Sequence, residues 1–232
     1  MKHERFINLE GCGLQVREAS EQEEQSRVVV GMPIVFGVRS RNLTPWHSTR
    51  EIYEVLEPGC ITKELIERSD VVLNWCHKND VIFARSVNGK GTLQLDVDDK
   101  CVRSEAEMPN TTAGNDVLEL IRRGDITGMS FAFEDNDDDP ESVTYEREAK
   151  QSADHKDVWI RRVRKITGLF DVSIVTHPAY TQTSVAQREI TDSMMEKIDS
   201  VSEKKTDDDA EQRQEEARKA ARRKETETLL LL

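Results

Sequence analysis

Short apolar runs separated by turn residues make up most of the chain up to about residue 187. Many of the residues in these runs are β-branched, and several runs, such as Glu51–Leu56, alternate polar with apolar positions. Alternation with a period of two is typical of strands with one buried face, whereas continuous apolar runs of this length indicate strands buried on both faces. The pattern predicts strands at 28–38, 51–56, 71–75, 81–86, 91–97, 102–108, 126–133, 158–160, 163–166 and 169–175, with a short strand around 14–16.

Helices are expected at only two places in this region. Thr62 is suited to cap a short helix over 63–68, and Asn115 or Asp116 could cap a second helix over 117–123. Many short strands with two or three helices are typical of a mainly β, α+β fold. We therefore expect an antiparallel β-rich domain with the form of a barrel.

The composition changes near residue 188. From there Lys, Arg, Glu, Asp and Gln dominate, and Gly, Pro and aromatic residues are absent. A helix is possible over 211–227, but its few apolar positions cannot bury a core alone. We expect a flexible N-terminal segment at 1–26, a folded domain at 27–187 and a charged helical or disordered extension at 188–232.

The charge and composition exclude several classes of protein. The chain has 33 Lys and Arg against 45 Asp and Glu, a formal charge of -12. A general nucleic-acid surface needs clustered cations, so binding to nucleic acid is not expected. The longest apolar run, Leu229–Leu232, is too short for a membrane span, and the start of the chain lacks the apolar region of a secretory signal. We expect a soluble, acidic protein.

The cysteines argue against a disulfide framework or a zinc site. They are widely spaced, without a CxxC pair, which favours a reducing, intracellular compartment. The four are Cys12, Cys60, Cys76 and Cys101.

Candidate catalytic residues are few, because the chain has five histidines. His77 follows an apolar strand directly and so lies where a side chain is both anchored and accessible. His177 is at another strand end, while His3, His47 and His155 lie in polar stretches.

Two serines lie within apolar strands. A buried hydroxyl without a partner costs about 1–3 kcal/mol, so Ser130 and Ser173 each either bond to a neighbouring group or face a pocket. The pattern alone leaves both possibilities open for both residues.

Several motifs nevertheless occur in a fixed order along the chain. They are Val30 to Val38, Glu57-Pro58-Gly59, His77 after its apolar strand, Gly91 to Asp96, Asp116 to Phe131, and Phe170 to Tyr180. In this order, over about residues 27–187, they resemble the prohead (capsid maturation) serine proteases of tailed phages, the HK97-type family. That family in turn resembles the herpesvirus assemblins, serine proteases built on a closed β-barrel flanked by helices. The resemblance thus implies a closed antiparallel β-barrel with a few flanking helices.

The resemblance implies roles for individual residues. By position, His77 matches the general base and Ser130 the nucleophile. Asp171 matches the third member, since phage proteases usually carry an acidic residue there, and His177 is the second choice. The donors that stabilise the oxyanion are placed by analogy around 176–179.

Physical chemistry agrees with this choice. A serine hydroxyl needs an adjacent imidazole to accept its proton, and a third group must orient the imidazole and stabilise its cation. Asp171 can do so as an anion, whereas His177 could act only as a weaker neutral acceptor. The three residues are far apart in sequence, so three strands must meet to unite them.

The resemblance also implies a biological setting. It predicts an endopeptidase that acts inside the assembling procapsid in the host cytoplasm, processes itself, and cleaves scaffold protein, the major capsid protein or both. Assemblins work as dimers, so a homodimer is possible here. The extension at 188–232 would either dock to scaffold or be removed by self-cleavage.

Two other classes compete with the peptidase. The first is a non-catalytic scaffolding protein, a barrel with a charged helical tail. The second, a barrel that binds a small ligand, is weaker because nothing predicts a cavity lined with polar groups.

No cofactor or metal is expected. The acidic stretch Asp135–Glu141 has Pro140 where a calcium-binding EF-hand loop needs glycine, so a solvated loop is the better interpretation. The basic run Arg161–Lys165 could pair with this loop, bind an acidic substrate, or form the solvated face of a strand.

Overall fold

The computed structural model describes residues 2–7, 12–19, 25–44, 48–148, 156–176 and 193–202. The chain divides into two compact units, residues 1–182 and 183–232. In the second unit, the described residues form one helix over 193–202. None of the described helices is long and apolar enough to cross a membrane. The three-part division expected from composition stays a prediction.

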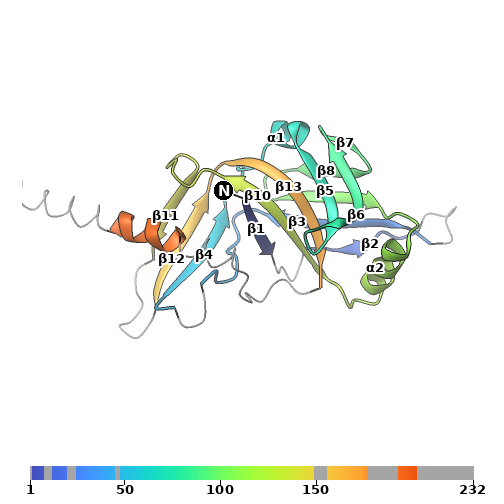
Figure 1. Cartoon of the computed structure of the whole chain (residues 1–232), viewed down its shortest axis with the longest axis horizontal. Helices are drawn as coiled ribbons and strands as arrows, with labels where there is room; N and C mark the ends of the chain where they lie inside the picture. Colours follow the sequence, from blue (N-terminus) through green and yellow to red (C-terminus); the bar gives the residue numbers. More distant parts are fainter. Residues whose placement is uncertain are drawn as a thin grey trace, which may run out of the picture. The chain divides into compact units, whose positions relative to one another are not determined.

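The largest sheet of the first unit, here called sheet A, has six strands in the order β1-β10-β13-β5-β6-β7. In Figure 1 the long strands β10 and β13 cross the centre of this unit. All neighbouring pairs are antiparallel except β13 and β5, which are parallel. The strands are β1 (Lys2–Ile7), β5 (Asp70–Trp75), β6 (Lys78–Val87), β7 (Lys90–Gly91), β10 (Gly128–Asp135) and β13 (Ile166–Val175).

Two smaller sheets complete the unit. Sheet B has the order β2-β3-β9-β8, and sheet C has the order β11-β12-β4, in which β12 and β4 are parallel. Their strands are β2 (Gln15–Val16), β3 (Val28–Val35), β8 (Leu93–Val97), β9 (Cys101–Glu107), β4 (Arg50–Leu56), β11 (Val143–Arg147) and β12 (Asp157–Val163).

This architecture confirms a mainly β, α+β fold but differs from the expected barrel in two respects. Over the described residues the strands form three sheets rather than one closed sheet, so closure is not confirmed. The parallel pairs join strands far apart in sequence, which no hairpin obliges to run antiparallel. Strands β1 and β2 both lie within the first 26 residues, and β2 matches the short strand expected around 14–16.

The two helices of this unit begin at threonine caps. Thr62 accepts a hydrogen bond from the N–H of Leu65 and caps α1 (Lys63–Arg68), as predicted. The second prediction is wrong, because Thr111 rather than Asn115 or Asp116 caps α2 (Thr112–Arg122). The helix already begins at Thr112, within the polar stretch that follows Pro109. α2 therefore includes one more turn at its start than the apolar pattern suggested.

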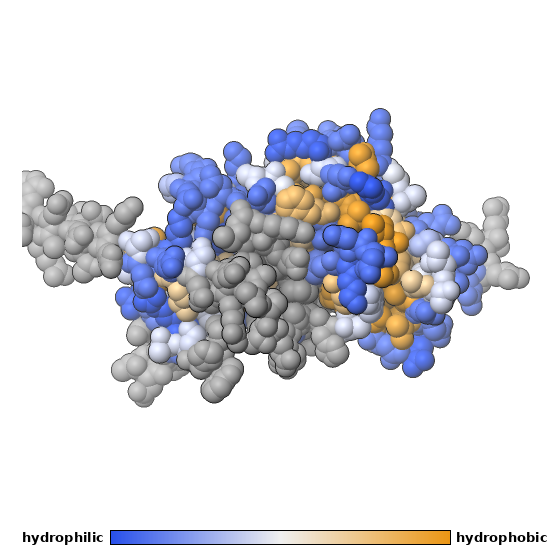
Figure 2. Space-filling view, viewed as in Figure 1, coloured by the Kyte–Doolittle hydropathy of each residue, from blue (hydrophilic) through white to orange (hydrophobic). Residues whose placement is uncertain are grey.

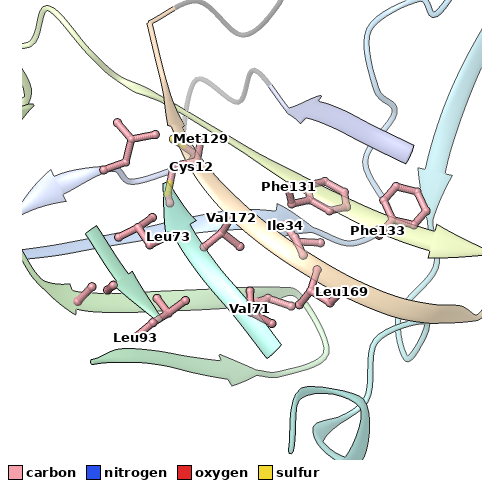
Figure 3. Packing of buried hydrophobic residues seen from close by; sticks show 14 of the residues in the cluster. Cys12, Ile34, Val71, Leu73, Leu93, Met129, Phe131, Phe133, Leu169 and Val172 are labelled. Atoms are coloured by element: carbon pink, nitrogen blue, oxygen red, sulfur yellow. The ribbon is translucent and has the colours of Figure 1, made fainter. Parts of the chain in front are cut away.

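The main hydrophobic core lies between sheets A and B. Figure 3 shows Met129 and Phe131 of β10 and Val172 of β13 pointing to one side of sheet A, toward Ile34 of β3. A Cβ added at Gly31 would approach the sulfur of Met129 to 2.5 Å, so the flexible Met129 side chain would have to shift to make room for it. Alternation along β10 and β13 therefore directs the intervening residues to the opposite face of sheet A.

The exposed apolar side chains are not spread evenly over the surface of the molecule. On the face of the molecule shown in Figure 2, apolar side chains gather over β5 and β6. Ile82 and Val87 of β6 are among the most exposed large apolar residues.

A buried ion cluster joins sheets A and C. Arg161 of β12 donates to Glu54 at 2.7 Å, to Asp135 at 2.6 Å and to Asp137 at 3.0 Å, and its Nε donates to the Tyr145 hydroxyl at 3.3 Å. The Arg161 side chain is fully buried. Burial acts to lower the pKa of its guanidinium, but the carboxylates, first of all Glu54, offset this and hold the pKa well above its usual value.

These contacts decide between the interpretations that the sequence allowed for the acidic stretch and the basic run. Asp135 and Asp137 pair with Arg161, so the acidic stretch is not simply a solvated loop. The neighbouring Arg162 pairs with Glu57 and Glu146 at the surface. The first of the three interpretations of the basic run, pairing with the acidic loop, is confirmed for Arg161.

Arg161→Ala should lower the free energy of unfolding by about 3–5 kcal/mol, because it leaves the Glu54 and Asp135 carboxylates buried without their cation. Urea denaturation followed by circular dichroism measures this change. Arg164→Ala, at an exposed position three residues on, serves as the control and should cost less than about 0.5 kcal/mol. A loss below about 1 kcal/mol for Arg161→Ala would show that the cluster contributes little.

Candidate active site

His77 lies at the tip of a two-residue turn between β5 and β6. Trp75 pairs with Lys78 on either side of the turn, and Cys76 and His77 have φ angles of 49° and 59°. Positive φ at both central residues defines the type I′ turn, whose twist matches that of the flanking strands. Such φ angles are unusual for residues other than glycine and cost about 1–3 kcal/mol each, so the surrounding structure must hold the turn in place.

That support comes from β13. The backbone N–H of His77 donates to Oγ of Ser173 at 2.9 Å, and the N–H of Cys76 donates to the carbonyl of Ile174 at 3.1 Å. The Ser173 hydroxyl in turn donates to Oδ1 of Asn74. Ser173 and Asn74 are both fully buried. The turn is therefore fixed to the strand that also carries Asp171.

The imidazole of His77 lies between an alcohol and a carboxylate. Its Nε2 is 2.6 Å from Oγ of Ser130, and its Nδ1 is 2.6 Å from Oδ1 of Asp171. The side chains of His77 and Asp171 are only 6% and 4% exposed, and Ser130 is fully buried. The three residues of the sequence prediction thus form a line in which His77 is within hydrogen-bonding distance of both Ser130 and Asp171.

Neighbouring strands bring these groups together. In the β10–β13 ladder Ser130 is paired with Ser173 and Ala132 with Asp171, and in the β13–β5 ladder Ser173 is paired with Asn74. Paired residues point to the same face of a sheet. Ser130, Asp171 and Ser173 therefore share the face of sheet A opposite the main core.

The hydrogen-bond geometry assigns the protons. An ionised carboxylate is an acceptor only, so Asp171 fixes the proton of His77 on Nδ1. Nε2 is then unprotonated and can accept the hydrogen bond of the Ser130 hydroxyl. This is the tautomer that a general base requires.

The side chains of the other histidines named from the sequence are not among those that the structure describes. His47, His155 and His177 lie outside the described residues, and His3 is in β1, of which only the backbone is described. Of the segment proposed for oxyanion stabilisation, only Thr176 is described. His177 as third member and the oxyanion donors stay predictions.

Sequence reasoning missed the supporting pair, Ser173 and Asn74. The sequence left open whether the Ser173 hydroxyl faces a pocket or bonds to a neighbouring group, and the structure shows it bonded to His77 and Asn74. Asn74 gave a signal that could have been used, since a polar amide within the apolar run Val71–Trp75 needs a buried partner.

The described residues contain no group of three or more His, Cys, Asp or Glu side chains placed to hold a metal ion. The cysteines are free, and Cys12, Cys60 and Cys101 are buried. Burial raises the pKa of the Cys60 thiol to about 12, so this thiol is protonated at neutral pH.

A serine, a histidine and an aspartate in a hydrogen-bonded line are the groups with which serine hydrolases activate a hydroxyl. A comparison of the sequence with known protein families supports the same class, the serine hydrolases. Residues 14–199 match the family model described as caudovirus prohead serine protease, and the chain therefore belongs to that family. Comparisons with curated proteins and with solved structures gave no match. The resemblance to phage prohead proteases is confirmed, and the further likeness to assemblins stays a prediction.

Ser173→Ala should lower kcat for peptide hydrolysis by up to about 100-fold and change KM less, because the His77 turn loses its anchor and the imidazole its position. Steady-state kinetics with a peptide substrate measure both constants, and Ser173→Thr, which keeps the hydroxyl, should restore most of kcat.

The matched control is Ser104→Ala, which removes a buried strand hydroxyl that donates to the Gly31 carbonyl in sheet B. If both alanine variants lower kcat equally, Ser173 acts only through stability.

Proposed function

We propose that the chain is the serine endopeptidase of phage capsid maturation, with Ser130 as nucleophile, His77 as general base and Asp171 as the residue that orients His77. The observation that carries this proposal is the imidazole placed 2.6 Å from both the alcohol and the carboxylate. Membership of the prohead protease family supports the same reaction.

The mechanism follows from the positions of the three groups. As Oγ of Ser130 attacks the carbonyl carbon of the substrate peptide, its proton passes to Nε2 of His77. Asp171 stabilises the resulting imidazolium through Nδ1. Collapse of the tetrahedral intermediate breaks the C–N bond, and His77 returns the proton to the leaving amine. Water then repeats the sequence on the acyl-enzyme and regenerates the Ser130 hydroxyl.

The substrates proposed are proteins of the procapsid. The enzyme would cleave itself and scaffold protein, the major capsid protein or both, within the assembling shell in the host cytoplasm. Peptide-bond hydrolysis inside a closed shell is in practice irreversible, so it can drive maturation in one direction. The helix at 193–202 belongs to the charged extension, which would dock to scaffold or be removed by the protease itself.

Ser130→Ala should abolish labelling by a serine-reactive phosphonate and lower peptide hydrolysis by at least about 10⁴-fold. Mass spectrometry of the labelled wild-type protein should place the adduct on Ser130, and Ser104→Ala should label normally. Co-expression with the neighbouring capsid gene product should give processed fragments with the wild type and none with Ser130→Ala. Absence of labelling under procapsid-like conditions would favour the non-catalytic scaffolding protein instead.

Asp171→Asn should lower kcat by about 10⁴-fold, because the amide can donate to Nδ1 and so favours the wrong tautomer of His77. His177→Ala should lower kcat by less than tenfold. Parallel kinetic measurements on the two variants decide between the two candidates for the third member. A large effect of His177→Ala together with a small effect of Asp171→Asn would reverse the assignment.

A further inference from the structure

The strand that carries Ser130 has one side on which a peptide could join the sheet. On its other side β10 pairs with β13, and the sheet continues through β5 and β6 to β7. The far edge, β7, is four strand spacings from β10, about 19 Å away, so a peptide added there could not reach Ser130. The edge of β10 that faces away from β13 is the position from which a peptide would meet the nucleophile.

That edge is occupied by the chain itself. Among the described residues, β1 (Lys2–Ile7) is the outermost strand of sheet A, and it pairs with β10 along six consecutive residues in antiparallel orientation. In this register Phe6 lies opposite Ser130, Ile7 opposite Met129 and Glu4 opposite Ala132. Residues paired in this way have Cα atoms about 4.5–5.5 Å apart, so the main chain of β1 passes directly beside the nucleophile.

An exposed strand edge is a general binding site for extended peptides. Its unpaired N–H and C=O groups accept an added strand, whose backbone hydrogen bonds supply affinity and fix the register. β1 already makes the contacts that such a substrate would make.

We propose that β1 is an internal occupant of the substrate-docking edge of β10. An extended peptide binds antiparallel to β10 in the place of β1, and the peptidase is inhibited while β1 remains paired. This inference rests on the proposed function in that it takes Ser130 as the nucleophile. It adds the binding mode of the substrate and a means of keeping the enzyme inactive.

A reversible covalent lock tests the proposal without disturbing the fold. The register places Lys2 opposite Glu134, at a separation that suits a disulfide, so Lys2→Cys with Glu134→Cys should fix β1 to β10 under oxidising conditions. Oxidation should lower kcat/KM for an extended peptide at least tenfold, and reductant should restore it. The single variant Lys2→Cys should show no such response. Equal turnover by the oxidised and reduced double variant would overturn the proposal.

A second experiment does not depend on catalysis. In Ser130→Ala protein, adjacent prolines (Glu4→Pro with Arg5→Pro) remove a ladder hydrogen bond whichever of the two N–H groups faces β10. The control, Glu4→Ala with Arg5→Ala, keeps both backbone N–H groups. A fluorescent peptide with the sequence of residues 2–9 should bind the proline variant at least tenfold more tightly than the control, as measured by anisotropy. Equal binding to both variants, or none to either, would contradict the proposal.

The two experiments separate this inference from the proposed function. Phosphonate labelling of Ser130 in the reduced double variant tests the nucleophile alone. If Ser130 is labelled but the disulfide lock does not change turnover, the role of β1 is rejected and the proposed peptidase function is retained. If the proline variant binds the peptide but the reduced double variant is not labelled, Ser130 is rejected as nucleophile and the docking edge of β10 is retained.

Discussion

The hydrogen bond from the backbone N–H of His77 to the Ser173 hydroxyl is the contact on which the arrangement of the site depends. It joins a turn in an unfavourable backbone conformation to the strand that carries Asp171, and so sets the imidazole against both of its partners. The two flanking contacts, from Cys76 to Ile174 and from Ser173 to Asn74, hold the same junction from either side. The distances to Ser130 and Asp171 thus follow from how strands β5, β13 and β10 pair, rather than from the three side chains alone.

Much of the strand content could be predicted from sequence, because most strands contain a short apolar run bounded by turn residues. The neighbours of each strand could not. β5 and β13 lie far apart along the chain and pair in parallel, which neither apolar periodicity nor a turn signal indicates. Strand β1 was not predicted because Lys2–Ile7 is largely polar, and an edge strand needs few apolar side chains when its backbone is satisfied by a neighbour.

The candidate site was predicted through an ordered set of motifs and not from any residue alone. His77, Ser130 and Asp171 are unremarkable singly, and only the order of the surrounding motifs distinguished them. The supporting residues were missed because Ser173 and Asn74 act through contacts across strands, which sequence spacing does not encode. For Arg161 the sequence left three interpretations of the basic run open, and the contacts with three carboxylates and a phenol that distinguish them come from different strands and loops.

The left-handed conformation of His77 has a practical consequence for preparing an inactive form of the protein. Alanine at this position would remove the imidazole and, unlike histidine and asparagine, is not among the residues enriched at positive φ, so its effects on chemistry and on the hairpin would be mixed. Asparagine tolerates this region of backbone space better than most residues and cannot act as a base at neutral pH. His77→Asn is therefore the better choice for trapping an intact complex with an uncleaved protein substrate.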